Sequence, residues 1–548
     1  MRHLITSALP YANGALHFGH LAGVYLPADI YTRHLRLKGE KCLHICGSDE
    51  HGVGIMQNAD KQKKQYKPYV DRWHKEHKDL FDLYGIDFDF FGQTSEPYHA
   101  EEVLEWFKLL LEKGFIEKQT EEQLQCQSCS NYLPDRYVEG KCYVCDYPEA
   151  RGDECPSCGT WIDPIKLIEP VCKFCGSQDI KTTEVDQWYL MLSKYHKEYR
   201  KWLEGQKGKW KKTVYSFLDS LTQEKMVDRA ITRDLKWGID VPLDEAKGKK
   251  LYVWFDAPIG YVSNTKKLLE GSEEHYLKDW WQNPETNLTH FVGKDNVIFH
   301  GLIFPVMSMA SGRVKPCDQL PANQYLNLGD QQFSKSKGVT VDAKGAIHQY
   351  GEDNLRYYLT TLIPENQDSN FTWEGFESRV NGELVNNIGN FFNRGLSFFW
   401  KNWKDGIGSS EISSFFESQE FKALLEKRDL SKRSLDRYEF KKALEIVMSA
   451  GQDCNAFFQE KEPWALIKTD ENACRAVIAE AAVRSLLIGG MLIPLLPQLS
   501  QKVFGLFELD SPEKIYTLDA SEFKPFIGDL IKLAKKPKAL VRKVELTE

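Results

Sequence analysis

A chain of 548 residues is too long to fold around one hydrophobic core, so we expect three or four domains. Hydrophobic residues make up 42% and charged residues 27% of the sequence, as in ordinary soluble proteins. The net charge of -8 excludes a general attraction to nucleic acid, so any RNA contact must use local basic patches.

The first fifty or so residues have the pattern of a βαβ unit. Apolar runs at 2–9 and 42–47 predict strands, with a helical stretch between them. Ligands of such units lie at the carboxyl ends of the strands, where Asp49 follows the second strand. Because the first strand begins within a few residues of the start, no room remains for a secretion signal. We therefore expect a cytoplasmic protein.

The turn after the first strand reads His-Phe-Gly-His at residues 17–20 and leads into a helical run. A helix N-terminus favours anions through its backbone N–H groups and its dipole. His17 and His20 can donate to phosphate oxygens, and Gly19 lets a nucleotide approach the backbone closely. This motif alone is weak evidence, because histidines near turns are often no more than satisfied polar groups.

A charged, aromatic-rich helical stretch is predicted over 67–118, and a cysteine-rich module follows over 120–183. The module holds four Cys-x-x-Cys pairs, namely Cys126/Cys129, Cys142/Cys145, Cys155/Cys158 and Cys172/Cys175. Two such pairs complete a tetrahedral all-thiolate zinc site, and a reducing cytosol favours zinc over disulfides. Sequential and nested pairing both satisfy the spacing. Either way we predict two closed, structural Zn²⁺ sites.

Five further cysteines stand outside these pairs and are interpreted as core residues: Cys42, Cys46, Cys317, Cys454 and Cys474. Strand-like runs resume at 251–255, 288–292 and 325–328. We expect them to complete a Rossmann-like, doubly wound parallel sheet, so that the cysteine module is an insertion between two halves of one nucleotide-binding domain.

Residues 333–338 read Phe-Ser-Lys-Ser-Lys-Gly, a polar loop that can bring Lys335 to the same phosphates as the turn at 17–20. Together the two segments predict activation of a carboxylate by ATP. The carboxylate attacks the α-phosphorus in line, so no enzyme nucleophile is required. Catalysis must come from positioning and from stabilising charge on the phosphate oxygens.

From about residue 353 the pattern is helical, and Phe440, Leu444, Val447 and Met448 repeat at helical spacing, which predicts a bundle. The apolar stretch at 486–496 is short and bounded by proline, so it predicts a buried helix rather than a membrane span.

The two signatures resemble the HIGH and KMSKS motifs of class I aminoacyl-tRNA synthetases. Flanking words at 9–14, 47–52, 254–261 and 293–300 are similar to those of the methionyl-tRNA synthetases, and the resemblance runs from residue 3 to about 500. It implies activation of L-methionine by ATP, with release of pyrophosphate. It then implies transfer of methionine to the 3′-terminal adenosine of tRNA(Met), including initiator tRNA. It also favours nested pairing, with one Zn²⁺ on the two inner Cys-x-x-Cys pairs and one on the two outer pairs.

The resemblance implies roles for individual residues. His17, His20 and Lys335 are the catalytic residues, and Mg²⁺ accompanies ATP. ATP binding falls to His17, Gly19, His20, Gly293, Asp295, Ser334, Lys335 and Ser336. Methionine binding falls to Leu9, Tyr11, Asp49, Trp254, Pro258, Tyr261, Phe299 and His300, with Tyr261 and the Leu9 N–H directed toward sulfur. Anticodon binding falls to Asn390, Arg394 and Trp464. Arg233 also resembles an active-site arginine of the family.

The sequence departs from the family at Gln332 and Phe333, where the KMSKS motif has its first lysine and its methionine. The contact of that first lysine is therefore in doubt. We expect a catalytic first half at 1–118, the insertion at 119–225, a catalytic second half at 226–325, a KMSKS-loop and stem-contact region at 326–375 and a helical anticodon-binding domain at 376–548. We expect no appended RNA-binding or dimerising module after the bundle, and we expect a monomer.

Three alternatives explain less of the chain. The first is a synthetase for another amino acid. Synthetases for leucine, isoleucine or valine need a large editing insertion, for which this chain has no room. A cysteine enzyme needs an active-site zinc, whereas the predicted thiolate clusters are closed. A nucleotidyltransferase with the same histidine motif would leave the helical third unexplained. A non-enzymatic zinc-containing RNA-binding protein would leave His17, His20 and Lys335 without a purpose.

Overall fold

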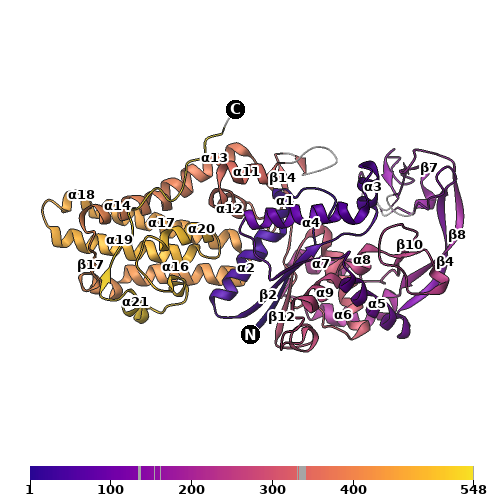
Figure 1. The fold of residues 1–548 in the computed structure, drawn as a ribbon, viewed down its shortest axis with the longest axis horizontal. Coiled ribbons are helices and arrows are strands. Elements are labelled where there is room, and N and C mark those ends of the chain that lie inside the picture. The colour runs from indigo at the N-terminus through magenta and orange to yellow at the C-terminus, as the bar shows by residue number, and fades with distance from the viewer. Residues whose placement is uncertain are drawn as a thin grey trace.

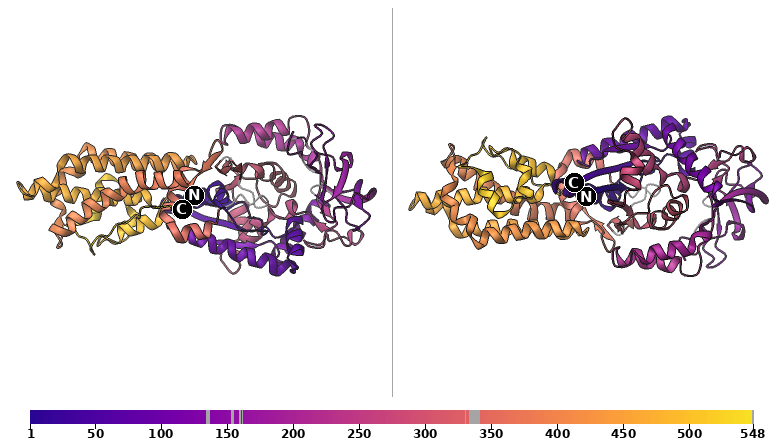
Figure 2. Two further views of the ribbon diagram at one scale, coloured as in Figure 1. Left: turned by 90° about the horizontal axis from the view of Figure 1, so that it is seen from above. Right: turned by 90° about the horizontal axis from the view of Figure 1, so that it is seen from below.

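The computed structural model describes residues 1–133, 137–152, 155–158, 160, 162–329, 331–332 and 341–546. The molecule is elongated, with a helical bundle at one end of its long axis and an α/β region at the other (Figure 1). Two strand ribbons lie at the outer edge of the α/β region, farthest from the bundle. Views from above and below show the same arrangement (Figure 2).

A five-stranded, wholly parallel sheet forms the centre of the α/β region. Its order is β13-β12-β1-β2-β3, with bounds Ala322–Asn323, Thr286–Gly293, Arg2–Ser7, Lys41–Ser48 and Phe90–Gln93. The chain runs outward from β1 through β2 to β3 on one side, and through β12 to β13 on the other. Ligands of such sheets bind at the carboxyl ends of the strands, next to the point where the strand order changes direction. The prediction of a Rossmann-like doubly wound sheet is confirmed.

Helices connect the strands and cover the sheet. Between β1 and β2 lie α1 (Phe18–His20), η1 (Leu21–Tyr25) and α2 (Leu26–Leu37). Between β2 and β3 lie α3 (Val53–Lys61) and α4 (Tyr66–Leu83), and α5 (Pro97–Glu112) follows β3. In the second half, helices are α8 (Val253–Asp256), α9 (Ile259–Leu268), η6 (Tyr276–Trp281), η7 (Lys294–Asn296), η8 (Phe299–Ile303) and α10 (Phe304–Ser311).

Two strand predictions and one helix prediction differ from the structure. The run 251–255 leaves only β11 (Lys250–Leu251), which pairs antiparallel with β10 (Thr232–Arg233), and then turns into α8. The run 325–328 forms β14 (Leu326–Leu328) in a separate sheet with β15 (Gln331–Gln332) and β16 (Ser369–Phe371). The region 67–118 contains β3 between α4 and α5. Short apolar runs do not distinguish a strand from a buried helical turn, which explains the error at 251–255. The run 325–328 is a strand as predicted but belongs to another sheet, and β3 is too short to give a periodic signal.

The insertion is built on a long antiparallel ribbon of β4 (Ile116–Cys126) and β8 (Ile180–Leu190), with β9 (Arg229–Ala230) beside it. At its tip, β5 (Val138–Lys141) pairs with β6 (Ala150–Arg151) and β7 (Ile168–Cys172), and η3 (Pro164–Lys166) precedes β7. The tip has its own small core, which includes Leu124, Leu133, Val138 and Ile162. After β8 come η4 (Leu192–Tyr195), α6 (His196–Glu204) and α7 (Lys212–Leu221), and η5 (Asp244–Ala246) precedes β11.

The helical region begins with α11 (Ala343–Tyr350), α12 (Glu352–Thr361), α13 (Trp373–Arg379), η9 (Val380–Gly389) and α14 (Asn390–Asn402). The bundle continues with η10 (Ser409–Ile412), α15 (Ser413–Glu417), α16 (Gln419–Asp436), α17 (Phe440–Lys461), α18 (Pro463–Leu466) and α19 (Glu471–Leu492). It ends with α20 (Pro497–Phe504), η11 (Pro512–Tyr516), α21 (Ala520–Ile527) and the small β17–β18 pair (Ile407–Gly408, Leu530–Ile531).

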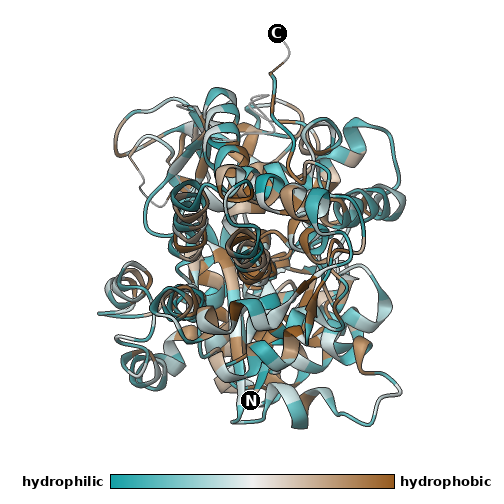
Figure 3. Cartoon of the chain, turned by 90° about the vertical axis from the view of Figure 1, so that its left-hand side faces the viewer, coloured by the Kyte–Doolittle hydropathy of each residue, from teal (hydrophilic) through white to brown (hydrophobic). Residues whose placement is uncertain are grey.

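The bundle core confirms the helical pattern read from the sequence. Phe440, Leu444, Val447 and Met448 are all buried along α17. Hydrophobic residues gather between the helices and hydrophilic residues on the outside, as the end-on view shows (Figure 3). The second half of α19 is buried on all sides and continues into the apolar stretch at 486–496. Across the part of the chain that the structure describes, every helix falls short of the length or apolarity that a membrane span requires.

Candidate active site

The turn at 17–20 lies directly beyond the carboxyl end of β1, at the start of the helical segment that becomes α2. His17 is the N-cap of α1 with an extended backbone, and its N–H donates to His20 Nδ1 at 3.1 Å. Because Nδ1 accepts, the proton of the neutral His20 ring is on Nε2, the form that can donate to a phosphate oxygen. The two imidazole rings lie 3.8 Å apart.

Gly19 is closely packed. A Cβ at this position would lie 3.0 Å from the His17 ring and 3.3 Å from the Leu326 carbonyl oxygen. Leu326 begins β14, so the chain leading into the polar loop starts beside the turn at 17–20. Phe18 packs on Phe371 of β16, 4.7 Å between ring centroids, and holds the same sheet in place.

The polar loop itself, with Phe333, Ser334, Lys335 and Ser336, lies outside the described residues, as does the side chain of Gln332. The prediction that Lys335 meets the phosphates bound by His17 and His20 therefore stays a prediction. What the structure places is the strand that leads into this loop, next to Gly19.

Asp49 lies at the carboxyl end of β2, next to the loop that follows β1. Its backbone N–H donates to the Pro10 carbonyl oxygen at 2.9 Å, and its carbonyl accepts the Ala12 N–H at 2.8 Å. The side chain is 6% exposed, and its Oδ1 has no hydrogen-bond partner among the described residues. Burial, with a smaller contribution from Asp256, raises the pKa of Asp49 well above its usual value. A buried carboxylate oxygen without a partner strongly favours binding a cation.

An aromatic wall faces this edge of the sheet. The Trp254 and Phe299 rings are stacked, with centroids 3.6 Å apart and planes within 6°. Trp254 comes from α8 and Phe299 from η8, whereas Pro258 is the N-cap of α9. Tyr11 completes the enclosure beside the turn at 52–54, where a Cβ at Gly52 would lie 2.8 Å from its hydroxyl.

A directed chain of hydrogen bonds runs behind the wall. His300 Nδ1 lies 3.0 Å from the Asn296 carbonyl oxygen, so it carries the ring proton, and Nε2 accepts from the Tyr261 hydroxyl at 2.7 Å. Burial lowers the pKa of His300 to about 4, which keeps the ring neutral. Burial raises the pKa of Tyr261 well above its usual value, and a backbone hydrogen bond from Leu9 opposes that rise. The two groups predicted to face sulfur thus contact one another.

Gly293 and Asp295 lie at the end of β12, beside β1. The Ala8 N–H donates to the Phe291 carbonyl oxygen at 2.9 Å, which brings the two strand ends together. Asp295 is exposed, and a Cβ at Gly293 would lie 2.6 Å from its Oδ1. The structure therefore brings the predicted ATP-binding and methionine-binding residues to one edge of the sheet, apart from those in the loop outside the described residues.

Arg233, in β10, is buried near this edge. Its guanidinium lies 4.3 Å from the Tyr252 ring, and its Nη1 donates to the Ala230 and Thr232 carbonyl oxygens at 3.0 and 2.8 Å.

Sequence reasoning missed a buried cluster next to Asp49. His51 Nδ1 lies 2.6 Å from Asp256 Oδ2, and His99 Nε2 lies 3.6 Å from the same oxygen. All three side chains are buried. Burial alone would raise the pKa of Asp256, but the two histidines hold it below its usual value. His51 lies in the segment 47–52, which resembles the family. His99 carries no local signal because it sits on the apolar face of α5.

The eight paired cysteines form two tetrads in nested order, with Cys126, Cys129, Cys172 and Cys175 in one and Cys142, Cys145, Cys155 and Cys158 in the other. Within each tetrad the sulfur atoms lie within 4.8 Å of one another, and facing pairs are 3.5 to 3.9 Å apart. Four thiolates around one Zn²⁺ at about 2.3 Å would be about 3.8 Å apart, so the donor set fits the ion. Each tetrad could hold a metal ion.

The other cysteines lie away from the tetrads. Four of them, Cys46, Cys317, Cys454 and Cys474, are buried as predicted, whereas Cys42 is only partly buried.

The predicted anticodon readers gather at the end of the bundle farthest from the sheet, around α14 and α18 (Figure 1). The Arg394 guanidinium lies 5.2 Å from the Trp464 ring, and its Nη2 donates to Gln459 Oε1 at 3.3 Å. Asn390 Nδ2 lies one turn earlier on α14, 3.4 Å from Asn455 Oδ1. Trp464 is 37% exposed, so its indole is available for stacking.

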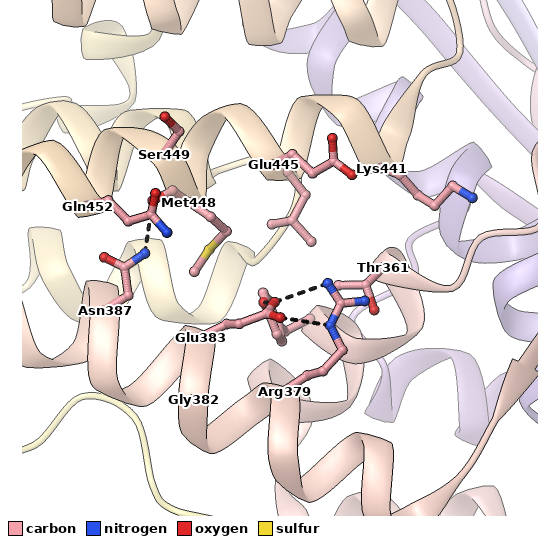
Figure 4. Close-up of a pocket in the computed structure, with 12 residues that line it drawn as sticks. Thr361, Arg379, Gly382, Glu383, Asn387, Lys441, Glu445, Met448, Ser449 and Gln452 are labelled. Atoms are coloured by element: carbon pink, nitrogen blue, oxygen red, sulfur yellow. Dashed lines mark hydrogen bonds and ion pairs between the residues drawn. The ribbon is translucent and has the colours of Figure 1, made fainter.

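A groove of about 330 Å³ lies between α12, η9 and α17 (Figure 4). Arg379 Nε donates to Glu383 Oε1 at 3.0 Å across one side, and Lys441 and Glu445 line the other. With two basic and two acidic lining residues, the groove has no net charge that would select an ion. It lies along the same helical seam as the predicted anticodon readers.

The chain is similar in sequence to known proteins. The family model described as tRNA synthetases class I (M) matches residues 3–396. The methionine–tRNA ligase of Chloroherpeton thalassium is 38% identical over 559 residues, which cover 99% of this chain and 79% of that protein. The methionine–tRNA ligase of Parabacteroides distasonis is 43% identical over 477 residues, which cover 86% of this chain and 69% of that protein.

The fold also matches a solved structure. The methionyl-tRNA synthetase of Mycobacterium tuberculosis in complex with methionyl-adenylate superposes with a TM-score of 0.80 at 21% identity, covering 98% of this chain and 99% of that chain. This likeness extends the shared fold across the sheet, the insertion and the bundle. The chain belongs to the methionine–tRNA ligase family of the class I tRNA synthetases.

Proposed function

We propose that the chain is a methionine–tRNA ligase. It activates L-methionine with ATP to methionyl-adenylate and pyrophosphate, and then transfers methionine to the 3′-terminal adenosine of tRNA(Met), including initiator tRNA. Relatives that carry this name and are 38% to 43% identical support the reaction class. The proposal also places the enzyme in the cytoplasm as a monomer, with the domain boundaries expected from the sequence.

One observation carries the assignment of the amino-acid site. The buried Asp49 Oδ1 without a partner lies at the same edge of the sheet as the stacked Trp254 and Phe299 rings. An α-ammonium group supplies the charge that Asp49 lacks, at about 1.5 to 3 kcal/mol for a charge-assisted hydrogen bond. A thioether is polarisable and packs well against rings. A free methionine has both groups.

Activation then needs no covalent enzyme intermediate. The methionine carboxylate attacks the α-phosphorus, the bond to the bridging oxygen breaks, and pyrophosphate leaves with the electron pair. His17 and His20 donate to the phosphate oxygens, and Lys335 is assigned to the leaving pyrophosphate. Asp295 accepts from the ribose hydroxyls beside Gly293. Mg²⁺ bound to ATP would neutralise part of the phosphate charge.

The cysteine tetrads are assigned as two structural Zn²⁺ sites. Each would hold its ion with four thiolates and leave no position open for substrate. A role in catalysis is thereby disfavoured, and the metal would instead stabilise the tip of the insertion, whose separate core is small. At the far end of the bundle, Trp464 would stack an unpaired anticodon base while Asn390 and Arg394 bond its edge.

ATP–pyrophosphate exchange measured against each amino acid tests the activation step, and charging of initiator tRNA tests the transfer step. Exchange that depends on methionine alone is expected. Exchange with another amino acid selects a different synthetase, and no exchange with retained tRNA binding selects a non-enzymatic RNA-binding protein. Metal analysis should find two zinc equivalents per chain, and fewer would remove one of the assigned clusters.

A further inference from the structure

Two separate elements hold the two ends of the methionine site. The turn at 49–52 carries Asp49, and the one-turn helix α8 carries Trp254. We propose that Asp256 is a positioning residue that, through His51 and His99, sets the separation between the ammonium-binding carboxylate and the aromatic wall. This inference rests on the proposed function and deepens it, because this separation decides which amino acid fits.

The contacts of Asp256 join three elements. Asp256 is the last residue of α8, and its Oδ2 lies 2.6 Å from His51 Nδ1, on the turn that carries Asp49. The same oxygen lies 3.6 Å from His99 Nε2, on α5. A four-residue helix has too few internal hydrogen bonds to hold its own position. The contacts with His51 and His99 therefore fix α8 against the turn.

His99 is itself anchored on the far side. Its Nδ1 lies 2.9 Å from the Ser263 hydroxyl on α9, which is the helix that carries Tyr261. The cluster thus reaches from the turn through α8 and α5 to α9. A shift of Asp256 would move Asp49 and Trp254 relative to one another.

A purely structural role would not explain the polar character of the cluster. Asp256 is 1% exposed, and its Oδ1 lacks a hydrogen-bond partner among the described residues. Leaving such an atom unpaired is unfavourable, and an apolar side chain would fix α8 without that cost. The carboxylate has a use if its charge acts on the substrate. The titratable groups that face this region are Asp49 and Glu50 on the turn, His51, His99 on α5, Tyr11 beside the turn and Tyr261 on α9.

The charge of Asp256 reaches Asp49. After burial, Asp256 is the next largest cause of the raised pKa of Asp49. Two buried carboxylates close together create a negative potential that favours an incoming ammonium group. They also make methionine binding depend on pH, because binding weakens as Asp49 takes up a proton. Removing the charge of Asp256 lowers the pKa of Asp49 and moves that loss of affinity to lower pH.

Glu102 provides a matched control on the same helix as His99. It is fully buried, but its carboxylate accepts from Arg313 Nε at 2.7 Å, Lys266 Nζ at 3.1 Å and Trp106 Nε1 at 3.1 Å. Its charge is thus fully partnered within the protein. Glu102→Gln is expected to lower stability and to leave the KM for methionine unchanged.

The test is ATP–pyrophosphate exchange with full-length Asp256→Asn. We expect the KM for methionine to rise about tenfold or more, as for a misplaced binding group, with the KM for ATP and kcat within about twofold. The pH at which the KM for methionine begins to rise should move to lower pH. An equal rise in both KM values, an unmoved pH profile, or the same methionine effect in Glu102→Gln would overturn the proposal.

A second pair of variants decides the matter if Asp256→Asn fails to fold, which circular dichroism will show. His51→Asn keeps a donor near the position of Nδ1, whereas His51→Ala removes it. We expect His51→Asn to keep the KM for methionine within about threefold and His51→Ala to raise it about tenfold. Equal effects of the two would overturn the proposal. Wild-type enzyme without methionine-dependent exchange would overturn the proposed function instead.

Discussion

The proposed methionine site and the proposed anticodon-reading surface use polar side chains in opposite ways. In the first, Asp49 Oδ1 and Asp256 Oδ1 are buried without hydrogen-bond partners among the described residues. In the second, Asn390 and Arg394 contact Asn455 and Gln459 at the surface, beside an exposed indole.

The difference follows from the size of each ligand. A small amino acid must be surrounded, so its site is built from buried groups whose partners the ligand supplies. Until it binds, those groups raise the free energy of the empty site. A tRNA covers an exposed surface, where water satisfies polar groups before binding and where stacking of Arg394 on Trp464 preorganises the side chains. Changes at the two sites should therefore separate activation from tRNA recognition.

The largest expected effect comes from His20→Ala. The variant loses a donor to the phosphate oxygens that develop charge during activation, and such a loss typically costs about 10² to 10³ in rate. We expect methionine-dependent exchange to fall by about this factor, while the affinity for tRNA, measured by filter binding, stays within about twofold. A matching fall in tRNA affinity would show that the two regions are not separable.

Asp49→Asn should have the next largest effect. The amide keeps the shape of the carboxylate but cannot pair its charge with an ammonium group, a loss of about 1.5 to 3 kcal/mol, or about 10- to 150-fold in the KM for methionine. In the wild type this KM should rise as pH falls, because binding needs the deprotonated form and the pKa of Asp49 is raised. The variant should lose that pH dependence, and a retained one would assign it to another group.

How well the sequence predicts a feature depends on how far apart in the sequence its residues lie. The turn at 17–20 and the Cys-x-x-Cys pairs are local patterns with a direct chemical meaning, and the structure places each at a helix N-terminus or in a tetrad. The Asp256 cluster joins positions 51, 99 and 256, which no local pattern connects.

The fold shows the same limit. β3 and β13 are four and two residues long, too short to give a periodic signal, and they belong to the sheet only because longer neighbours pair with them. Likewise, residues 253–255 are of types that favour strands, but they form a helical turn because tertiary packing overrides local preference there.

Trp464→Ala tests the proposed anticodon-reading surface. Loss of base stacking costs about 1 to 3 kcal/mol, so the KM for tRNA in charging should rise about 5- to 150-fold while exchange is unchanged. Leu430 is a suitable control, since it is an apolar residue of the bundle with nearly the same exposure, 39% against 37%. Leu430→Ala should leave charging intact. If Trp464→Ala slows exchange as much as charging, the assignment of the bundle is wrong.

The smallest expected effect concerns the polar contact that bridges the bundle and the α/β region. Asp436 of α16 contacts His34 Nε2 at 2.8 Å and Lys38 Nζ at 2.7 Å, at the end of the helical segment that begins at Phe18. Partial burial acts in the opposite direction, but these hydrogen bonds lower the pKa of Asp436 to about 2. A lowered pKa stabilises the fold above the unfolded value near 4, and this stabilisation is lost as pH falls toward 2.

Because Asp436 is 41% exposed, Asp436→Asn should lower the free energy of unfolding by only about 0.5 to 1 kcal/mol, as for a surface ion pair. Urea midpoints of the variant and the wild type should differ at pH 6 and converge as pH falls from 4 to 2. Exchange without tRNA should not change, because the methionine site draws its partners from the ligand rather than from the bundle. A large loss of exchange would mean that the bridge, although weak, holds the turn at 17–20 in its active geometry.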